Sequence, residues 1–143
     1  MMISEMKEIE LEDIAIICNY INDEAKANGV VTDPFAVSSN IEFLIKDRDN
    51  GSYKIEDNGV IIAFMIYEKH RYENVLAHFY VEPRYRTYRS VMVPLISKLV
   101  EEFKGKRLNY KKLHSKVDAI THYANNGEID LIALEEFVNR IKR

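Results

Sequence analysis

Three arginines, Arg84, Arg86 and Arg89, lie close together in the sequence, directly after Pro83. A proline ends a central strand because it cannot donate to the ladder, and the apolar periodicity after these residues predicts a helix. The loop of residues 83–91 therefore combines guanidinium groups with a helix N-terminus, whose unpaired N–H groups and positive dipole end bind phosphate. This loop is the predicted anion site.

Basic residues are concentrated around this loop. Residues 84–116 hold ten bases and two acids, a charge of +8, whereas the whole chain of 143 residues carries −3, so the remainder carries −11. Such a field favours a polyanionic ligand, either a nucleic acid or a phosphorylated small molecule. The alternative is a solvated basic face without a ligand.

Other chemistries find little support in the spacing of residues. The four histidines, His70, His78, His114 and His122, show no metal-binding spacing, so we expect no metal site. The sequence has no Walker loop, paired dinucleotide fingerprint or Gly-x-Ser-x-Gly turn. The single cysteine, Cys18, excludes an intramolecular disulfide and favours a reducing compartment.

The composition is that of one soluble globular domain. Hydrophobic residues make up 47% of the chain and charged residues 30%, and neither a repeat nor a linker divides it. We therefore expect a single domain over residues 1–143. The longest apolar run, residues 60–67, is too short to span a bilayer, and the N-terminus lacks the pattern of a signal peptide. These features predict a cytoplasmic protein that does not bind membranes.

The elements that position the loop follow from hydrophobic periodicity. A short strand is expected at Ile9 and Leu11, followed by a helix over residues 14–25. Ser39 and Glu42 have the spacing of a capping box that opens a second helix. Strands are expected over residues 52–56, 60–68 and 75–82, and the turn Asp57-Asn58-Gly59 joins the first two.

The second half begins with the clearest helix, expected to start between Ser90 and Met92 with Pro94 in its first turn. A strand over residues 108–117 and a short helix between Asp118 and Gly127 follow. Residues 128–141 fit either a strand or a helix. The order β-α-α-β-β-β-α-β-α predicts an α/β fold with a mixed sheet and helices on both faces.

Two motifs resemble one known family. Val81-Glu82-Pro83-Arg84-Tyr85-Arg86, followed by an amphipathic helix, resembles the Val-x-Pro-x-Tyr-Arg stretch that leads into the acetyl-CoA loop of the GNAT superfamily of N-acetyltransferases. Ala119-Ile120-Thr121-His122-Tyr123, with Gly127, is similar to that family's Ala-Ile-x-x-Tyr-x-x-x-Gly segment near the C-terminus. The resemblance covers roughly residues 6–130 and implies a GNAT-like acyl-CoA N-acyltransferase fold.

The acetyl-CoA loop departs from the family pattern at its glycines. The family pattern is Arg/Gln-x-x-Gly-x-Gly/Ala, and here Arg89 and Val91 stand where glycines let the pyrophosphate approach the backbone. Two outcomes are open from the sequence. The Cβ atoms at these positions block the cofactor, or the loop takes a shifted path in which Arg89 and Ser90 contact phosphate through their side chains.

The resemblance also implies roles for individual residues. Tyr123 would protonate the leaving thiolate, and Glu73 or His78 would accept the proton of the amine. The alternatives are a packing role for the Tyr123 ring and an ordinary polar strand position for His78. The cofactor would be held by residues at the strand end and in the loop: Tyr80, Val81, Arg86, Thr87, Tyr88, Arg89, Ser90 and Val91.

Three functions follow as alternatives. The first is an acetyl-CoA-dependent N-acetyltransferase that moves an acetyl group to an amine on a small molecule or a protein, without a metal. The second is a catalytically inactive GNAT-fold binding protein, such as a viral accessory or virion component in a host cytoplasm or virion. The third is a nucleic-acid-binding module that uses the basic window and its tyrosines. A homo-oligomer is compatible with each.

Overall fold

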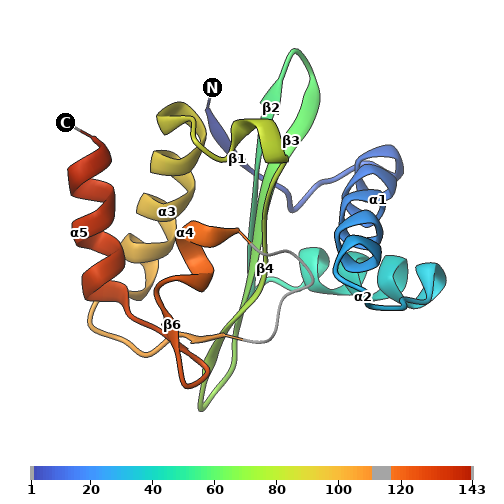
Figure 1. The fold of residues 1–143 in the computed structure, drawn as a ribbon. Coiled ribbons are helices and arrows are strands. Elements are labelled where there is room, and N and C mark those ends of the chain that lie inside the picture. The colour runs from blue at the N-terminus through green and yellow to red at the C-terminus, as the bar shows by residue number, and fades with distance from the viewer. Residues whose placement is uncertain (1, 111–116, 143) are drawn as a thin grey trace.

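A mixed sheet forms the centre of the computed structural model, which describes residues 2–110 and 117–142. Its seven described strands lie in the order β1-β2-β3-β4-β5-β7-β6, with helices on both faces (Figure 1). All neighbouring strands are antiparallel except β4 and β5, which are parallel. The predicted α/β fold with a mixed sheet is confirmed.

The first strand lies earlier than the sequence predicts. β1 (Ile3–Glu5) pairs with β2 (Gly51–Asp57), whereas Leu11 begins helix α1 (Leu11–Ala27). The prediction of a strand at Ile9 and Leu11 is therefore wrong. Because the hydrogen-bond partners of β1 are about 50 residues away, no local pattern marks it.

Helix α2 (Pro34–Lys46) also begins earlier than predicted. Asp33 is its N-cap, because the carboxylate Oδ1 accepts a hydrogen bond from the Phe35 N–H at 3.0 Å. Pro34 then occupies the first helical position, where its missing N–H costs nothing. Ser39 lies inside the helix, so the predicted capping box with Glu42 is wrong.

A three-stranded meander follows the two helices. β2 turns into β3 (Val60–Lys69) through Asn58 and Gly59, whose φ angles of 52° and 78° belong to a two-residue hairpin turn. β4 (Asn74–Val81) pairs with the other edge of β3. The predicted strands and hairpin are confirmed.

After β4 the chain forms a short 3-10 turn, η1 (Pro83–Tyr85), and then helix α3 (Arg89–Phe103). Pro94 is inside α3 and not in its first turn, because the helix starts at Arg89. Of the strand predicted over residues 108–117, the structure describes β5 (Asn109–Tyr110), and residues 111–116 lie outside the described residues.

The C-terminal part resolves the open alternatives. Helix α4 (Asp118–Thr121) leads to a hairpin of β6 (Ala124–Asn125) and β7 (Glu128–Ile129), and helix α5 (Leu131–Ile141) follows. Residues 128–141 therefore contain both a strand and a helix. Gly127, with φ 76°, lies in the β6–β7 turn with Asn126, so its predicted position at a helix end is wrong.

The sheet separates two hydrophobic cores. α1 and α2 cover one face, and α3, α4 and α5 cover the other (Figure 1). In β4, Phe79 and Val81 belong to the α3–α5 core, whereas Tyr80 belongs to the α1–α2 core. In the described part of the chain, no helix has both the length and the apolar composition needed to cross a bilayer.

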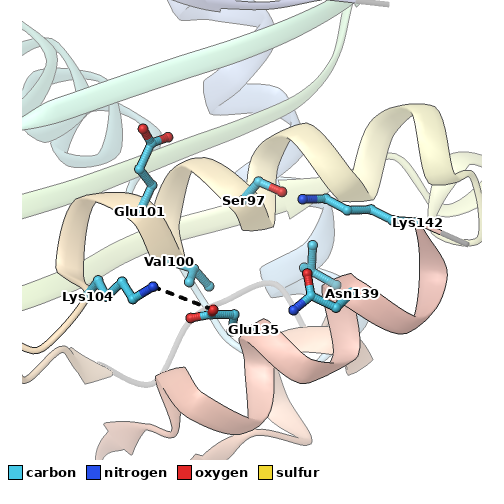
Figure 2. A pocket seen from close by; sticks show the side chains of 8 residues that line it. Ser97, Val100, Glu101, Lys104, Glu135, Asn139 and Lys142 are labelled. Carbon is cyan, nitrogen blue, oxygen red and sulfur yellow. Dashed lines mark ion pairs between the residues drawn. The ribbon is translucent and has the colours of Figure 1, made fainter.

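A hollow of about 260 Å³ opens between the C-terminal part of α3 and α5 (Figure 2). Lys104 and Glu135 face each other across it, with Nζ and Oε1 3.7 Å apart. The hollow is open to solvent and is lined by side chains of both charges. It is separate from the N-terminus of α3, where the sequence predicts the anion site.

Candidate cofactor site

The candidate site begins where β4 leaves the sheet. The Glu82 N–H donates to Ile62 O at 2.8 Å, and Pro83 then starts η1. Successive turns follow, because the Tyr85 N–H donates to Glu82 O at 2.9 Å and the Tyr88 N–H to Tyr85 O at 3.1 Å. The chain thus passes from the end of a strand to the N-terminus of α3 within a few residues.

The first turn of α3 has the features of an anion site. Tyr88 is the N-cap and gives no side-chain hydrogen bond to the helix, and the first turn contains no acidic residue. The Val91 and Met92 N–H groups donate to Tyr88 O at 3.1 and 2.9 Å. Positive charge therefore comes from the helix dipole and from the exposed Arg89, whereas Arg84, which is also exposed, forms an ion pair with Glu82.

Arg89 and Val91, which replace the glycines of the family pattern, adopt ordinary backbone conformations. Among the described non-glycine residues, a positive φ occurs at Asn58 and Asn126 and nowhere in this loop. Val91 is fully buried in the α3–α5 core, whereas Arg89 is exposed. The Val91 Cβ therefore points into the core, away from the surface that an anion would approach, and only Arg89 adds a side chain there.

The exposed residues of the loop are Pro83, Arg84, Thr87, Tyr88, Arg89 and Ser90. The Tyr88 ring is 48% exposed and packs edge-on against Tyr85, with ring centroids 5.2 Å apart. The Tyr85 hydroxyl donates to Asp57 Oδ2 at 2.6 Å, which ties the loop to the β2–β3 hairpin. The loop is thus held to the β2–β3 hairpin on one side, and its residues 87–90 are exposed to solvent on the other.

Arg86 is engaged by the protein. Its Nε–H donates to Val81 O at 2.7 Å, and its Nη2 donates to Glu24 Oε1 of α1 at 2.8 Å. The guanidinium also lies over the Tyr80 ring, 5.7 Å from the centroid. The residue predicted to bind pyrophosphate therefore links β4 to α1 in the structure.

Tyr80 forms the other side of this cluster. Its ring stacks between Tyr20 and Phe64, with centroid distances of 4.7 and 5.4 Å. Burial, reinforced by the nearby Glu24 carboxylate, raises the pKa of Tyr80 well above the usual value for a tyrosine. Val81 turns its side chain to the opposite core and offers its carbonyl to Arg86.

β4 carries a bulge that the sequence did not indicate. His78 is paired with Ile66 and Leu76 with Tyr67, so Ala77 is the extra residue between them. A bulge reorients the backbone groups of a strand and is common next to active sites. No glycine or proline marks this position, and the register that creates the bulge is set by the neighbouring strand.

The predicted acid and bases lie in different places. Strand alternation puts His78 on the α1–α2 side with Tyr80. Glu73 precedes β4 and accepts a hydrogen bond from Asn109 Nδ2 at 2.8 Å. At about 3.3 Å per residue, the length of β4 puts roughly 23 Å between Glu73 and the loop end of the strand.

Tyr123 lies on the other side of the sheet, packed against the α3–α5 core. Its ring contacts Phe137 of α5, with centroids 5.6 Å apart, and its hydroxyl oxygen accepts a hydrogen bond from Arg140 Nη2 at 3.2 Å. The proton of the Tyr123 hydroxyl is not used in this bond. The structure therefore brings His78 near the aromatic cluster of Tyr80, and it places Glu73 and Tyr123 apart from that cluster.

Many bases of the +8 window are paired with acids from other parts of the chain. The ion pairs are Arg84–Glu82, Arg86–Glu24, Lys104–Glu135 and Arg107–Glu128. Each pair cancels positive charge that the sequence alone would assign to a free basic face. Among the described residues, no group of three His, Cys, Asp or Glu side chains is placed to hold a metal ion.

The comparisons with known proteins give different results for the sequence and for the structure. The sequence matches no family model and no curated protein sequence. The structure, in contrast, matches solved acetyltransferases over most of its length.

Three solved structures illustrate the match. PaiA N-acetyltransferase from Thermoplasma acidophilum, solved with coenzyme A, has a TM-score of 0.58 and 14% identity, covering 90% of this chain and 96% of that chain. A Staphylococcus aureus protein assigned to the GNAT family has a TM-score of 0.59 and 18% identity, covering 70% and 88%. An aminoglycoside 6'-N-acetyltransferase complexed with coenzyme A has a TM-score of 0.58 and 12% identity, covering 77% and 61%. The chain therefore has the fold of the GNAT superfamily of acetyltransferases.

Proposed function

We propose that this chain is an acetyl-CoA-dependent N-acetyltransferase whose acceptor is an amine on a small molecule or a protein. The observation that carries the proposal is the junction of β4, η1 and α3. There an uncapped helix N-terminus opens beside Arg84, Arg86 and Arg89, directly after a bulged strand. Two of the solved proteins with this fold are complexes with coenzyme A.

In this proposal the loop binds the pyrophosphate. The positive end of the α3 dipole and the exposed side chains of Thr87, Arg89 and Ser90 would face the anion. The backbone of Tyr80 and Val81, beyond the bulge at Ala77, would hold the pantetheine arm. This arrangement would orient the thioester toward the amine, and fixed orientation lowers the barrier of such a transfer.

The chemistry needs two proton transfers. The amine nitrogen attacks the thioester carbonyl, the C–N bond forms, and the C–S bond of the tetrahedral intermediate breaks. Tyr123 would give its hydroxyl proton to the departing thiolate. His78, on the opposite side of the sheet from Tyr123, is out of direct reach of the same thioester and would accept the proton of the amine only through intervening waters. Glu73 is the less suitable base because roughly 23 Å of strand separates it from the loop end.

The test is a calorimetric titration with acetyl-CoA and with coenzyme A. We expect saturable binding that weakens in Arg89→Ala and in Arg86→Ala. Arg71→Ala is the matched control, because Arg71 is exposed and follows β3, at the opposite end of β4. Since Arg86 also links β4 to α1, its variant is compared with the wild type for its unfolding midpoint. The absence of binding at millimolar cofactor would exclude the enzyme function.

A second candidate is a non-catalytic protein that keeps the GNAT fold for binding. The observation that favours it is the loop itself, in which both family glycines are replaced and Arg86 is already paired with Glu24. This candidate predicts that no acetyl-CoA binds, so the same titration distinguishes the two functions.

A further inference from the structure

The ion pair between Arg86 and Glu24 joins the candidate pyrophosphate loop to helix α1. Arg86 Nη2 and Glu24 Oε1 are 2.8 Å apart. The side chains are only 24% and 16% exposed, respectively, so solvent screens the pair weakly. Most exposed surface pairs contribute little to stability, but a poorly solvated charge that loses its partner is strongly disfavoured.

The geometry of Arg86 favours the pair. The Nε–H group is anchored on Val81 O at 2.7 Å, which fixes the plane of the guanidinium and directs Nη2 toward α1. The Tyr80 ring lies beneath the guanidinium and supports the same orientation. Arg86 is therefore held in place by three groups, of which Glu24 is the charged one.

The same guanidinium is a ligand for pyrophosphate in the proposed function, on which this inference rests. A carboxylate at hydrogen-bond distance neutralises most of the charge that a phosphate would feel. An incoming pyrophosphate would in turn be repelled by the Glu24 carboxylate. The Arg86 guanidinium therefore cannot pair fully with the Glu24 carboxylate and with the pyrophosphate at the same time.

We propose that Glu24 and the pyrophosphate of the cofactor compete for Arg86. In the free protein Glu24 holds the Arg86 guanidinium toward α1, and cofactor binding transfers the guanidinium to the phosphates and breaks this ion pair. Glu24 is thus a regulatory residue that lowers the affinity of the site for coenzyme A and couples the α1–α2 layer to its occupancy.

The experiment measures coenzyme A binding by calorimetry for the wild type, Glu24→Gln and Glu82→Gln. Glu24→Gln keeps the shape of the side chain and removes its charge. We expect it to bind coenzyme A about five-fold more tightly, the change that corresponds to about 1 kcal/mol. Glu82→Gln removes a charge next to the same loop, but Glu82 pairs with Arg84 and not with Arg86. The affinity of this variant for coenzyme A should therefore stay within about two-fold of the wild type.

A second measurement follows Arg86 directly by NMR of its Nε–Hε group. In the wild type the signal should shift when coenzyme A is added, and in free Glu24→Gln it should already be displaced toward the bound position. Unfolding midpoints of all three proteins check that the variants fold.

The outcomes separate the two proposals. Tighter binding in Glu24→Gln alone supports the competition. Equal or weaker binding in Glu24→Gln, or an equal gain in both variants, would overturn the competition while the proposed function stands. If none of the proteins binds coenzyme A, the proposed function fails and the competition fails with it.

Discussion

At the N-terminus of α3, side chains take the place of the glycines that the GNAT pattern has at the same spacing. The two replacements differ physically, because Val91 fills the α3–α5 core and Arg89 extends into solvent. Val91 is therefore part of the packing of the helix, whereas a substitution of Arg89 would remove no volume from the core. This difference leads to a prediction for variants that restore the family glycines.

Val91→Gly should destabilise the protein by about 3 kcal/mol, since it empties a buried site and adds the helix cost of glycine. Arg89→Gly, at the exposed first position of α3, should cost about 1 kcal/mol or less. Urea unfolding of both variants measures the difference. Similar losses at the two positions would show that Val91 does not pack as described.

Tyr123 carries a prediction for catalysis within the proposed function. Tyr123→Phe keeps the ring against Phe137 but removes the proton donor, so kcat should fall about 100-fold with little change in the KM for acetyl-CoA. Tyr72→Phe is the matched control, because Tyr72 is 88% exposed in the β3–β4 turn. An unchanged kcat in Tyr123→Phe would leave this tyrosine with a packing role only.

At the scale of elements, the predictable parts of the fold are those with a local pattern. The apolar face of α3 and the Asn58-Gly59 turn each depend on residues close together in the sequence, so the sequence predicts both. β1 and the bulge at Ala77 depend on partners in other strands. The Arg86–Glu24 pair joins the loop after β4 to helix α1 across 62 residues of sequence. The sequence thus indicated the loop and its arginines, but not what Arg86 contacts.

Helix α3 contains a proline that its own hydrogen-bond pattern does not accommodate. Pro94 is the sixth residue of α3 and cannot donate to the carbonyl of Ser90, four residues earlier. Pro94→Ala restores that donor, so we expect the free energy of unfolding to rise by about 1 kcal/mol. Denaturant titration measures the change. A loss of stability would mean that the ring of Pro94 packs more favourably than the restored hydrogen bond.

At the scale of the whole molecule, the sheet carries a buried tyrosine toward each of its two cores. Tyr67 belongs to the α3–α5 core and Tyr80 to the α1–α2 core. Burial is the main cause that raises the pKa of both hydroxyls above their ordinary value of 10.0. Because ionisation of either tyrosine requires exposure to solvent, each couples the fold to alkaline pH.

Raising the pH above the ordinary pKa of tyrosine should lower the stability of the folded protein. Below pH 10 both hydroxyls are protonated in the folded and unfolded states, and the stability is unaffected. Above pH 10 the unfolded chain loses protons that the folded chain retains, so stability should fall by up to about 1.4 kcal/mol per pH unit for each tyrosine. Urea unfolding between pH 9 and 11 measures the slope, and Tyr80→Phe should reduce it. An equal slope in that variant would contradict the assignment to Tyr80.

The single thiol of the chain lies in the α1–α2 core. Cys18 is 6% exposed, and burial raises its pKa, so the folded protein presents little reactive thiolate. A disulfide reagent such as DTNB can therefore label the protein only when α1 separates from the elements packed against it. Cys18 is therefore a built-in reporter of that opening. The rate at which the reagent labels Cys18, measured with and without coenzyme A, would give the frequency of the opening without any introduced probe.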